Sequence, residues 1–404
     1  MPEFAVTALR AAGSFGLILL LTSAMHHTSP WSILWTAPLL LLASVLIAWA
    51  AESAQFFIAQ GFALAILAWL QTLPEFAVEA VLAWHQETAL LLSNLTGALR
   101  LLTGVGWPLI YGTAAIYHRS QGRGPLRKIT LERQDSVQVF TLIGILVWIF
   151  VIYFKGSLTL IDSAILIGLY GAYLYLLNRL PTKGHEEIEE LESIPRAVVT
   201  AKPAIRNAAI SAMFLLGGGL IFFVAEPFLG SLLAVATTVG ISQFVAVQWI
   251  APFVSEFPEK VSAFYWARSI DRAPMALMNM VSSNINQWTL LAAMLPIVLS
   301  LGAGKVSLIP FDDQQSLELL MTAGQSLLGV LLLLDMELTW WEAMLLFALW
   351  AVQFGFSIAP GTEASFIHWA VTIAYFVWCA IQIAKLATLR KMPAAWTAFR
   401  QMAG

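Results

Sequence analysis

The sequence predicts an all-α polytopic membrane protein made of two inverted five-helix repeats with an extra helix at each end, about 12 transmembrane helices in total. Three observations predict this fold class. The composition is too apolar for a soluble domain, apolar segments long enough to cross a bilayer recur along the chain, and one polar motif occurs twice.

The composition places the chain in the bilayer. Of 404 residues, 59% are hydrophobic and 11% are charged, whereas about a quarter of the residues of a soluble domain are charged. The single cysteine, Cys379, excludes a disulfide within the chain, and a net charge of -3 gives no reason to expect a nucleic-acid partner. Arg10 precedes an apolar run that we interpret as an uncleaved first helix. We expect a multi-pass protein of the cell inner or plasma membrane, of unknown oligomeric state.

The length of each apolar segment identifies the predicted membrane spans, since about 20 helical residues cross a hydrocarbon core. Those at 88–117 and 231–266 exceed a straight span and contain Pro or Gly, so we expect them to be broken. The predicted helices lie near 8–26, 32–59, 61–84, 88–117, 137–154, 159–178, 205–229, 231–266, 272–301, 315–334, 340–357 and 365–387.

Basic residues predict the orientation. They crowd the links after the fourth, sixth and eighth predicted helices, which lie on one face because two spans separate each link from the next. The positive-inside rule assigns that face to the cytoplasm, and both termini with it. The residues concerned are Arg119, Arg123, Arg127, Lys128, Arg133, Arg179, Lys183, Arg196, Lys202, Arg206, Arg268 and Arg272.

The repeated motif sets the domain boundaries. LPEFAVEAVLAW, followed by a Ser/Asn patch, is matched by SEFPEKVSAFYW, and later KGSLTLID is matched by DMELTWWE. Five spans in each half invert the second copy. We predict an extra helix at 1–31, repeats at 32–180 and 205–357, a cytoplasmic acidic link at 181–204, and a further helix and tail at 358–404.

Each motif offers hard oxygen ligands. A charged side chain at membrane depth costs about 3 kcal/mol, so such groups usually mark an ion or substrate path. Pro74 and Pro258 are expected to break their helices and to leave carbonyls upstream without a donor, around Gln71 and Thr72 and at Ser255. Carboxylate, amide, hydroxyl and carbonyl oxygens suit Na⁺ or Ca²⁺. Glu75 and Glu259 together would neutralise one divalent metal ion.

These residues resemble the two alpha-repeats of the sodium/calcium exchanger (calcium/cation antiporter) superfamily, whose pattern runs T-S-x-P-E and then G-N-x-x-G-S-N-x-x-N. The resemblance covers residues 32–357. It implies that Glu75 and Glu259 are central cation ligands, facing one another near the midplane. The further ligands that it implies are Gln71, Thr72, Ser255, Glu256, Asn94, Asn279, Ser283, and either Asn286 or Gln287.

The first copy departs from the family pattern. Ala98 stands where the family has Ser, and Leu102 where it has Asn, so half of one ligand set is missing. The possible charge partners at the site are Arg100, Lys260 and Glu79. Arg100 could form an ion pair with Glu75 or Glu79 that is purely structural.

The leading interpretation is a secondary antiporter that exchanges Ca²⁺ or Na⁺ for Na⁺ or H⁺ by alternating access. The lost ligands leave open a family member that has altered specificity or does not transport. A membrane-embedded enzyme is not expected, because the sequence shows no paired His and no His-Glu helix motif. The expected partners are lipid and inorganic cations, and no cofactor is expected beyond the transported Ca²⁺, Na⁺ or H⁺.

Overall fold

The computed structural model describes residues 29–57, 69–70, 72–179, 188, 191–269, 271–357, 362–389 and 393–403. Eight segments of this part of the chain are helical, long and apolar enough to cross a membrane, which confirms the polytopic helical fold. The predicted helix at 8–26 and most of the 61–72 region lie outside the described residues. The chain forms two units: Met1–Val81 with Pro181–Glu259, and Leu82–Leu180 with Lys260–Gly404.

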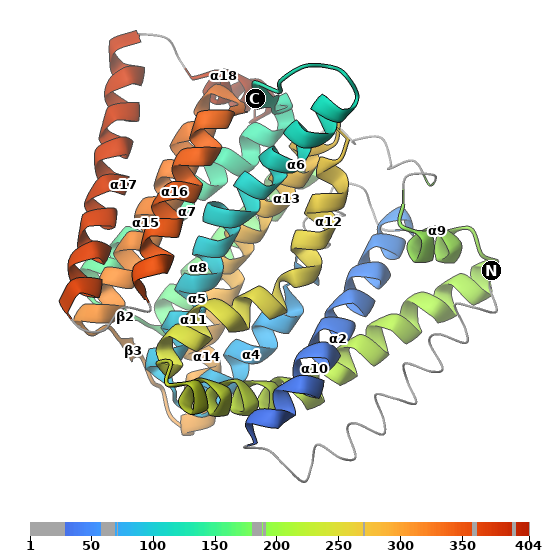
Figure 1. The fold of residues 1–404 in the computed structure, drawn as a ribbon, viewed down its shortest axis with the longest axis vertical. Coiled ribbons are helices and arrows are strands. Elements are labelled where there is room, and N and C mark those ends of the chain that lie inside the picture. The colour runs from blue at the N-terminus through green and yellow to red at the C-terminus, as the bar shows by residue number, and fades with distance from the viewer. Residues whose placement is uncertain are drawn as a thin grey trace. The chain divides into compact units, whose positions relative to one another are not determined.

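In the first unit, α2 (Ile33–Ala54) packs along the 37-residue α10 (Pro203–Val239), as Figure 1 shows. Gly217 permits the close approach, because a Cβ there would lie 2.9 Å from Ile47 Cγ1. The predicted helix boundary between 229 and 231 is wrong. Helix α10 runs on until Gly240, whose φ of 75° terminates it as a left-handed cap.

The rest of the predicted 231–266 helix is broken, as expected. It divides into α11 (Gln243–Ser255) and α12 (Phe257–Ala267). The predicted acidic link also contains structure, since α9 (Ser193–Val199) packs against α2. Trp49 Nε1 donates to a carboxylate oxygen of Glu192 at 2.8 Å. This end of the link is therefore part of the first unit.

The second unit contains corresponding helices from both halves of the sequence. The first set is α5 (Thr88–Leu101), the π-helix η3 (Leu102–Gly106), α6 (Trp107–Ser120), α7 (Ser136–Lys155) and α8 (Leu160–Asn178). The second set is α13 (Ala273–Asn286), the π-helix η6 (Gln287–Leu291), α14 (Ala292–Ala303), α15 (Asp313–Leu332) and α16 (Trp340–Ser357). The same order of elements occurs twice.

Two short antiparallel ribbons join the sets. Strand β1 (Lys128–Thr130) pairs with β4 (Glu337–Thr339), and β2 (Ser157–Leu158) pairs with β3 (Ile309–Pro310). Strand β1 precedes α7, the third helix of the first set, and β4 precedes α16, the fourth helix of the second set. Strand β2 precedes α8, the fourth helix of the first set, and β3 precedes α15, the third helix of the second set. A two-fold rotation that exchanges the sets therefore exchanges the ribbons, which fits inverted repeats.

The matched KGSLTLID and DMELTWWE segments form equivalent turns. Thr159 caps α8, and its backbone N–H and hydroxyl donate to Asp162 at 2.8 and 2.7 Å. Thr339 donates in the same way to Glu342, at 2.8 and 2.6 Å. Each acid satisfies donors at the start of its helix, as in a capping box.

Two further helices follow the second set. Helix α17 (Thr362–Leu389) packs along α15 and α16 and is drawn in red in Figure 1. Helix α18 (Ala394–Ala403) lies on α7, where the rings of Trp396 and Phe399 are centred 5.5 and 5.1 Å from that of Phe140. The other described elements are α4 (Leu73–Trp84) and the 3-10 turns η1 (Pro30–Ser32), η2 (Gln55–Phe57), η4 (Arg133–Asp135) and η7 (Leu333–Asp335).

Candidate cation-binding site

Both Pro-Glu pairs lie in the first turn of a short helix that follows a break. Pro74 and Glu75 are the second and third residues of α4, and Pro258 and Glu259 occupy the same places in α12. Proline is tolerated there because the first-turn N–H groups have no partner within the helix. Both carboxylates are entirely buried. A helix N-terminus favours negative charge, which reduces the cost of burying each acid.

The residues just before each break present hydroxyl groups. Thr72 Oγ1 donates to the Trp69 carbonyl at 2.8 Å, and Ser255 Oγ donates to the Pro252 carbonyl at 3.4 Å. Each hydroxyl proton points to a backbone carbonyl, so the lone pairs of the hydroxyl oxygen can face a cation. The expectation that the Thr72 carbonyl lacks a donor is wrong, because Phe76 N donates to it at 3.1 Å. A missing proline N–H affects the carbonyl four residues earlier, which here is Leu70.

The other acids of the motifs are also buried. Glu79 follows Glu75 by one helical turn and so shares its face of α4. Glu256 is the single residue between α11 and α12, and Lys260 directly follows Glu259. Among the described residues, no three His, Cys, Asp or Glu side chains gather as a metal site. A cation here would therefore need amide, hydroxyl or carbonyl oxygens as well as carboxylates. Gln71 lies outside the described residues.

The second unit holds the polar patches that follow each motif. Both α5 and α13 are 14 residues long, and each runs directly into a five-residue π-helix. Helix α5 packs against η6, and α13 packs against η3, so each patch lies beside the π-turn of the other copy. Such turns are frequent at functional sites. The candidate ligands here, all buried, are Asn94, Asn279, Ser283, Asn286 and Gln287.

The hydrogen bonds of α13 distinguish Ser282 and Asn284, which have internal partners, from Ser283. Ser282 Oγ accepts from Gln138 Nε2 at 3.0 Å and lies 3.1 Å from the Tyr173 hydroxyl. Asn284 donates to the Met280 carbonyl at 3.2 Å, and its Oδ1 accepts from the Thr103 hydroxyl at 3.4 Å. Ser283 Oγ, in contrast, is entirely buried and has no hydrogen-bond partner among the described residues. A buried hydroxyl of this kind is a natural cation ligand.

Arg100 has a buried partner that the sequence analysis missed. Its Nη1 lies 2.5 Å from Glu318 Oε2, and Glu318 Oε1 lies 3.3 Å from His368 Nδ1. Glu318 is on α15, within a run of otherwise uncharged residues, and that isolation was the only signal in the sequence. The pairing of Arg100 with Glu75 or Glu79, which belong to the other unit, stays a prediction.

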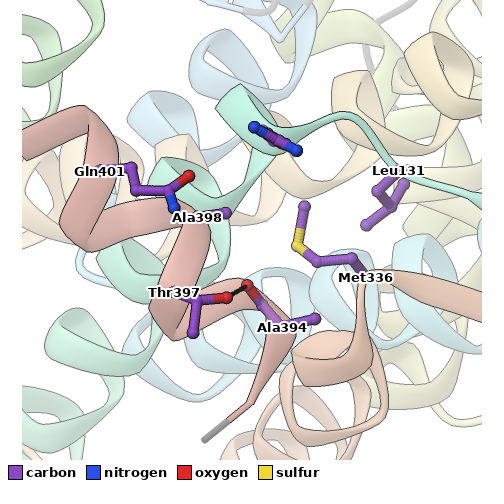
Figure 2. A pocket seen from close by; sticks show the side chains of 7 residues that line it. Leu131, Met336, Ala394, Thr397, Ala398 and Gln401 are labelled. Carbon is purple, nitrogen blue, oxygen red and sulfur yellow. Dashed lines mark hydrogen bonds between the residues drawn. The ribbon is translucent and has the colours of Figure 1, made fainter.

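A separate cavity of about 250 Å³ lies beside α18 (Figure 2). Its lining is Leu131, Arg133, Met336, Ala394, Thr397, Ala398 and Gln401. Among the described residues, the lining includes the guanidinium of Arg133 and no carboxylate, so its chemistry does not suit a cation.

Comparisons with known proteins give a family match and similar structures. The chain matches the family model for the sodium/calcium exchanger protein over residues 27–178 and 210–359. It is similar to the crystal structure of the H⁺/Ca²⁺ exchanger CAX, with 32% sequence identity and a TM-score of 0.87 over 99% of this chain and 97% of that chain. The comparison with curated proteins gave no match.

Two more distant structures share the fold alone. The sodium-calcium exchanger NCX_Mj, soaked with 10 mM Na⁺ and zero Ca²⁺, has 18% identity and a TM-score of 0.53, over 85% of this chain and 98% of that chain. The structure of native YfkE has 16% identity and a TM-score of 0.54, over 91% of this chain and 99% of that chain.

Proposed function

The chain belongs to the sodium/calcium exchanger protein family, and from that premise we propose that it is a secondary antiporter exchanging Ca²⁺ for H⁺ by alternating access. The observation that carries the proposal is the pair of buried carboxylates, Glu75 and Glu259, each in the first turn of a helix that follows a break. The similarity to an H⁺/Ca²⁺ exchanger over nearly the whole of both chains supports the choice of ions.

The two carboxylates explain why the ions would exchange. Burial in a low-dielectric environment disfavours a bare carboxylate, so each acid requires a proton or a cation beside it. One Ca²⁺ neutralises two carboxylates, and two protons do the same. Release of Ca²⁺ is then coupled to proton uptake at Glu75 and Glu259, and the charge of the site stays constant through the cycle.

The neutral ligands would complete the coordination. Ca²⁺ takes six to eight oxygens, so two carboxylates are too few. We assign the remaining oxygens to Thr72 and Ser255 on the Pro-Glu segments and to Asn94, Asn279 and Ser283 on the polar helices. The further candidate ligands are Gln71, Glu256, Asn286 and Gln287.

The membrane arrangement follows the same premise. The protein is a multi-pass membrane protein, and we place both termini in the cytoplasm because the basic links share one face. The repeats are taken as 32–180 and 205–357, with 1–31 and 358–404 as additions. These bounds predict that the two repeats superpose after a rotation about an axis in the membrane plane.

Flux through purified protein tests the proposal. Liposomes carrying an imposed pH gradient should take up Ca²⁺ as protons leave, and an imposed Na⁺ gradient should not drive uptake. Glu75→Gln with Glu259→Gln should abolish uptake, while the exposed Glu87→Gln leaves it unchanged. Uptake driven only by Na⁺ would contradict the proposed ion pair, and a wild-type protein that moves no ion would contradict transport itself.

A further inference from the structure

A buried ionic network joins three helices of the second unit. Arg100 on α5, Glu318 on α15 and His368 on α17 are connected by contacts of 2.5 and 3.3 Å. Arg100 is entirely buried, and Glu318 and His368 are 2% and 9% exposed. Arg100 belongs to the first set of helices and Glu318 to the second. His368 belongs to the helix that follows the second set. The proposed exchange mechanism does not use any of these groups.

Further hydrogen bonds fix each member in place. Arg100 Nε donates to the Thr96 carbonyl at 3.1 Å, and the Arg100 carbonyl accepts from Gln325 Nε2 at 3.2 Å. On the other side, His368 Nε2 lies 3.4 Å from the Ser357 hydroxyl on α16. Glu318 is therefore held between a guanidinium and an imidazole that are each anchored to a separate helix.

The network continues into the π-turn of the first copy. Gly104, within η3, approaches α15 and α16 so closely that a Cβ would lie 2.7 Å from Gln325 Nε2 and 2.5 Å from Trp350 Cβ. Gln325 thus contacts both the Arg100 backbone and the π-turn. The same side chain therefore lies against both the Arg100 backbone and the turn.

The charge of Arg100 is a problem for a cation site. Asn94 lies on the same helix, six residues earlier, which is about 9 Å along the axis. A buried positive charge on the helix that presents this patch disfavours a cation there, because electrostatic repulsion is strong in a medium of low dielectric constant. A buried ion pair is weak evidence for stability, since apolar residues of similar volume often serve as well. The pair therefore calls for another explanation.

We propose that Glu318, oriented by His368, is a positioning residue that compensates the charge of Arg100 and so allows the polar patch of α5 to take a cation. This inference rests on the proposed function. It assigns a role to α17, because that helix supplies the imidazole that sets the Glu318 carboxylate. The first copy, which has fewer candidate ligands, carries the positive charge of Arg100. Glu318, from the second copy, compensates that charge.

The signs of the mutational effects test this role. Glu318→Gln removes the negative charge that lies 2.5 Å from Arg100 Nη1, and the apparent Ca²⁺ affinity should fall by about tenfold or more with little change in maximal rate. Arg100→Gln should leave the affinity unchanged or raise it, and Arg100→Gln with Glu318→Gln should recover to within about threefold of wild type. His368→Gln should give an intermediate loss of about threefold, because Glu318 keeps its charge but loses one orienting contact.

A purely structural network gives a different pattern. Arg100→Gln and Glu318→Gln would then both lower affinity and rate, and the double variant would be at least as weak as either. That result overturns the inference, as does wild-type affinity in Glu318→Gln. If Glu318→Gln does not fold, a loss of affinity in Arg100→Gln overturns it alone, and unchanged or higher affinity supports it.

The matched control is an exposed ion pair in the same unit. Lys128 and Glu337 also lie 2.5 Å apart, with their side chains 50% and 29% exposed. Glu337→Gln should not alter affinity, since solvent screens an exposed pair. Binding is measured by titration of the purified protein with Ca²⁺, and rates by liposome flux, with Na⁺ titrated in parallel. A wild type that binds Na⁺ alone overturns the proposed ion pair, and the same series then tests the inference with Na⁺. Binding of neither ion overturns both.

Discussion

The two polar helices of the second unit have the same geometry and different chemistry. Helices α5 and α13 have equal length, and each is followed by a π-helix of five residues. Counted from their first residues, Asn94 corresponds to Asn279. Ala98, however, corresponds to Ser283, and Leu102 corresponds to Gln287. The two helices thus share their length and their π-turn, while the side-chain oxygens at two positions of α13 have no counterpart on α5.

The difference indicates that the helix and its π-turn do not depend on the oxygen-bearing side chains. Ala98 and Leu102 are entirely buried and satisfy the packing of α5 without offering an oxygen. Arg100 corresponds to Ile285, so the first copy carries a buried positive charge that the second lacks at this position, and Glu318 lies beside it. We therefore expect the second copy to dominate cation affinity.

The largest effect should come from the acid of the second copy. Glu259→Gln is expected to lower Ca²⁺ flux by about 100-fold or more, since it removes the Pro-Glu carboxylate of the copy with the fuller proposed ligand set. Glu75→Gln should leave residual flux with an altered dependence on pH, because its copy contributes fewer ligands. Flux in liposomes measures both, and wild-type flux in Glu259→Gln would exclude that acid from the site.

The π-turn of the first copy should be the most sensitive point for stability. In Gly104→Ala the new methyl group would clash with Trp350, and we expect a loss of about 1–3 kcal/mol. Gly144→Ala on α7 is the control, since among the described residues no atom beyond its own stretch of helix lies within 4 Å of the Cβ position. Thermal unfolding in detergent compares the two, and equal melting temperatures would show that the close approach is not required.

Neighbouring serines of the second copy should separate binding from stability. Ser283→Ala should reduce Ca²⁺ affinity by about tenfold without loss of stability, because it removes a proposed ligand that makes no hydrogen bond within the described part of the chain. Ser282→Ala should instead reduce stability by about 1–3 kcal/mol, because it leaves the Gln138 and Tyr173 groups without that partner. Calcium titration and thermal unfolding of both variants would reveal the reverse pattern if the assignment is wrong.

The smallest effect should follow from restoring the first copy. Ala98→Ser with Leu102→Asn supplies the oxygens that the second copy has, and affinity should rise by about threefold. The same two substitutions in the Arg100→Gln background should raise it further. If neither protein gains affinity in a Ca²⁺ titration, the first patch does not contact the ion.

Most of the helices could be predicted from the sequence, because membrane spans depend on length and hydropathy. The Pro-Glu helix starts and the Thr-acid turns were also readable, since proline and capping residues act locally. The continuation of α10 beyond residue 229 was not, because it depends on tertiary packing against η1 and α2, where Thr36 Oγ1 lies 2.9 Å from Ser231 Oγ.

The network around Glu318 could not be predicted either. Arg100, Glu318 and His368 lie far apart in the chain and match no spacing pattern, so only the packing of α5, α15 and α17 brings them together. The spacing of the α13 side chains likewise could not distinguish Ser283 from Ser282. Their roles depend on which neighbours, Gln138 and Tyr173, reach which hydroxyl.

The most direct test of the exchange mechanism is a simultaneous record of Ca²⁺ uptake and proton release in the same liposomes. Two carboxylates that hold either one Ca²⁺ or two protons predict a ratio of about two protons for each Ca²⁺, with no net charge movement. Ca²⁺ uptake without proton release, or uptake that requires Na⁺ on the opposite side, would contradict that mechanism.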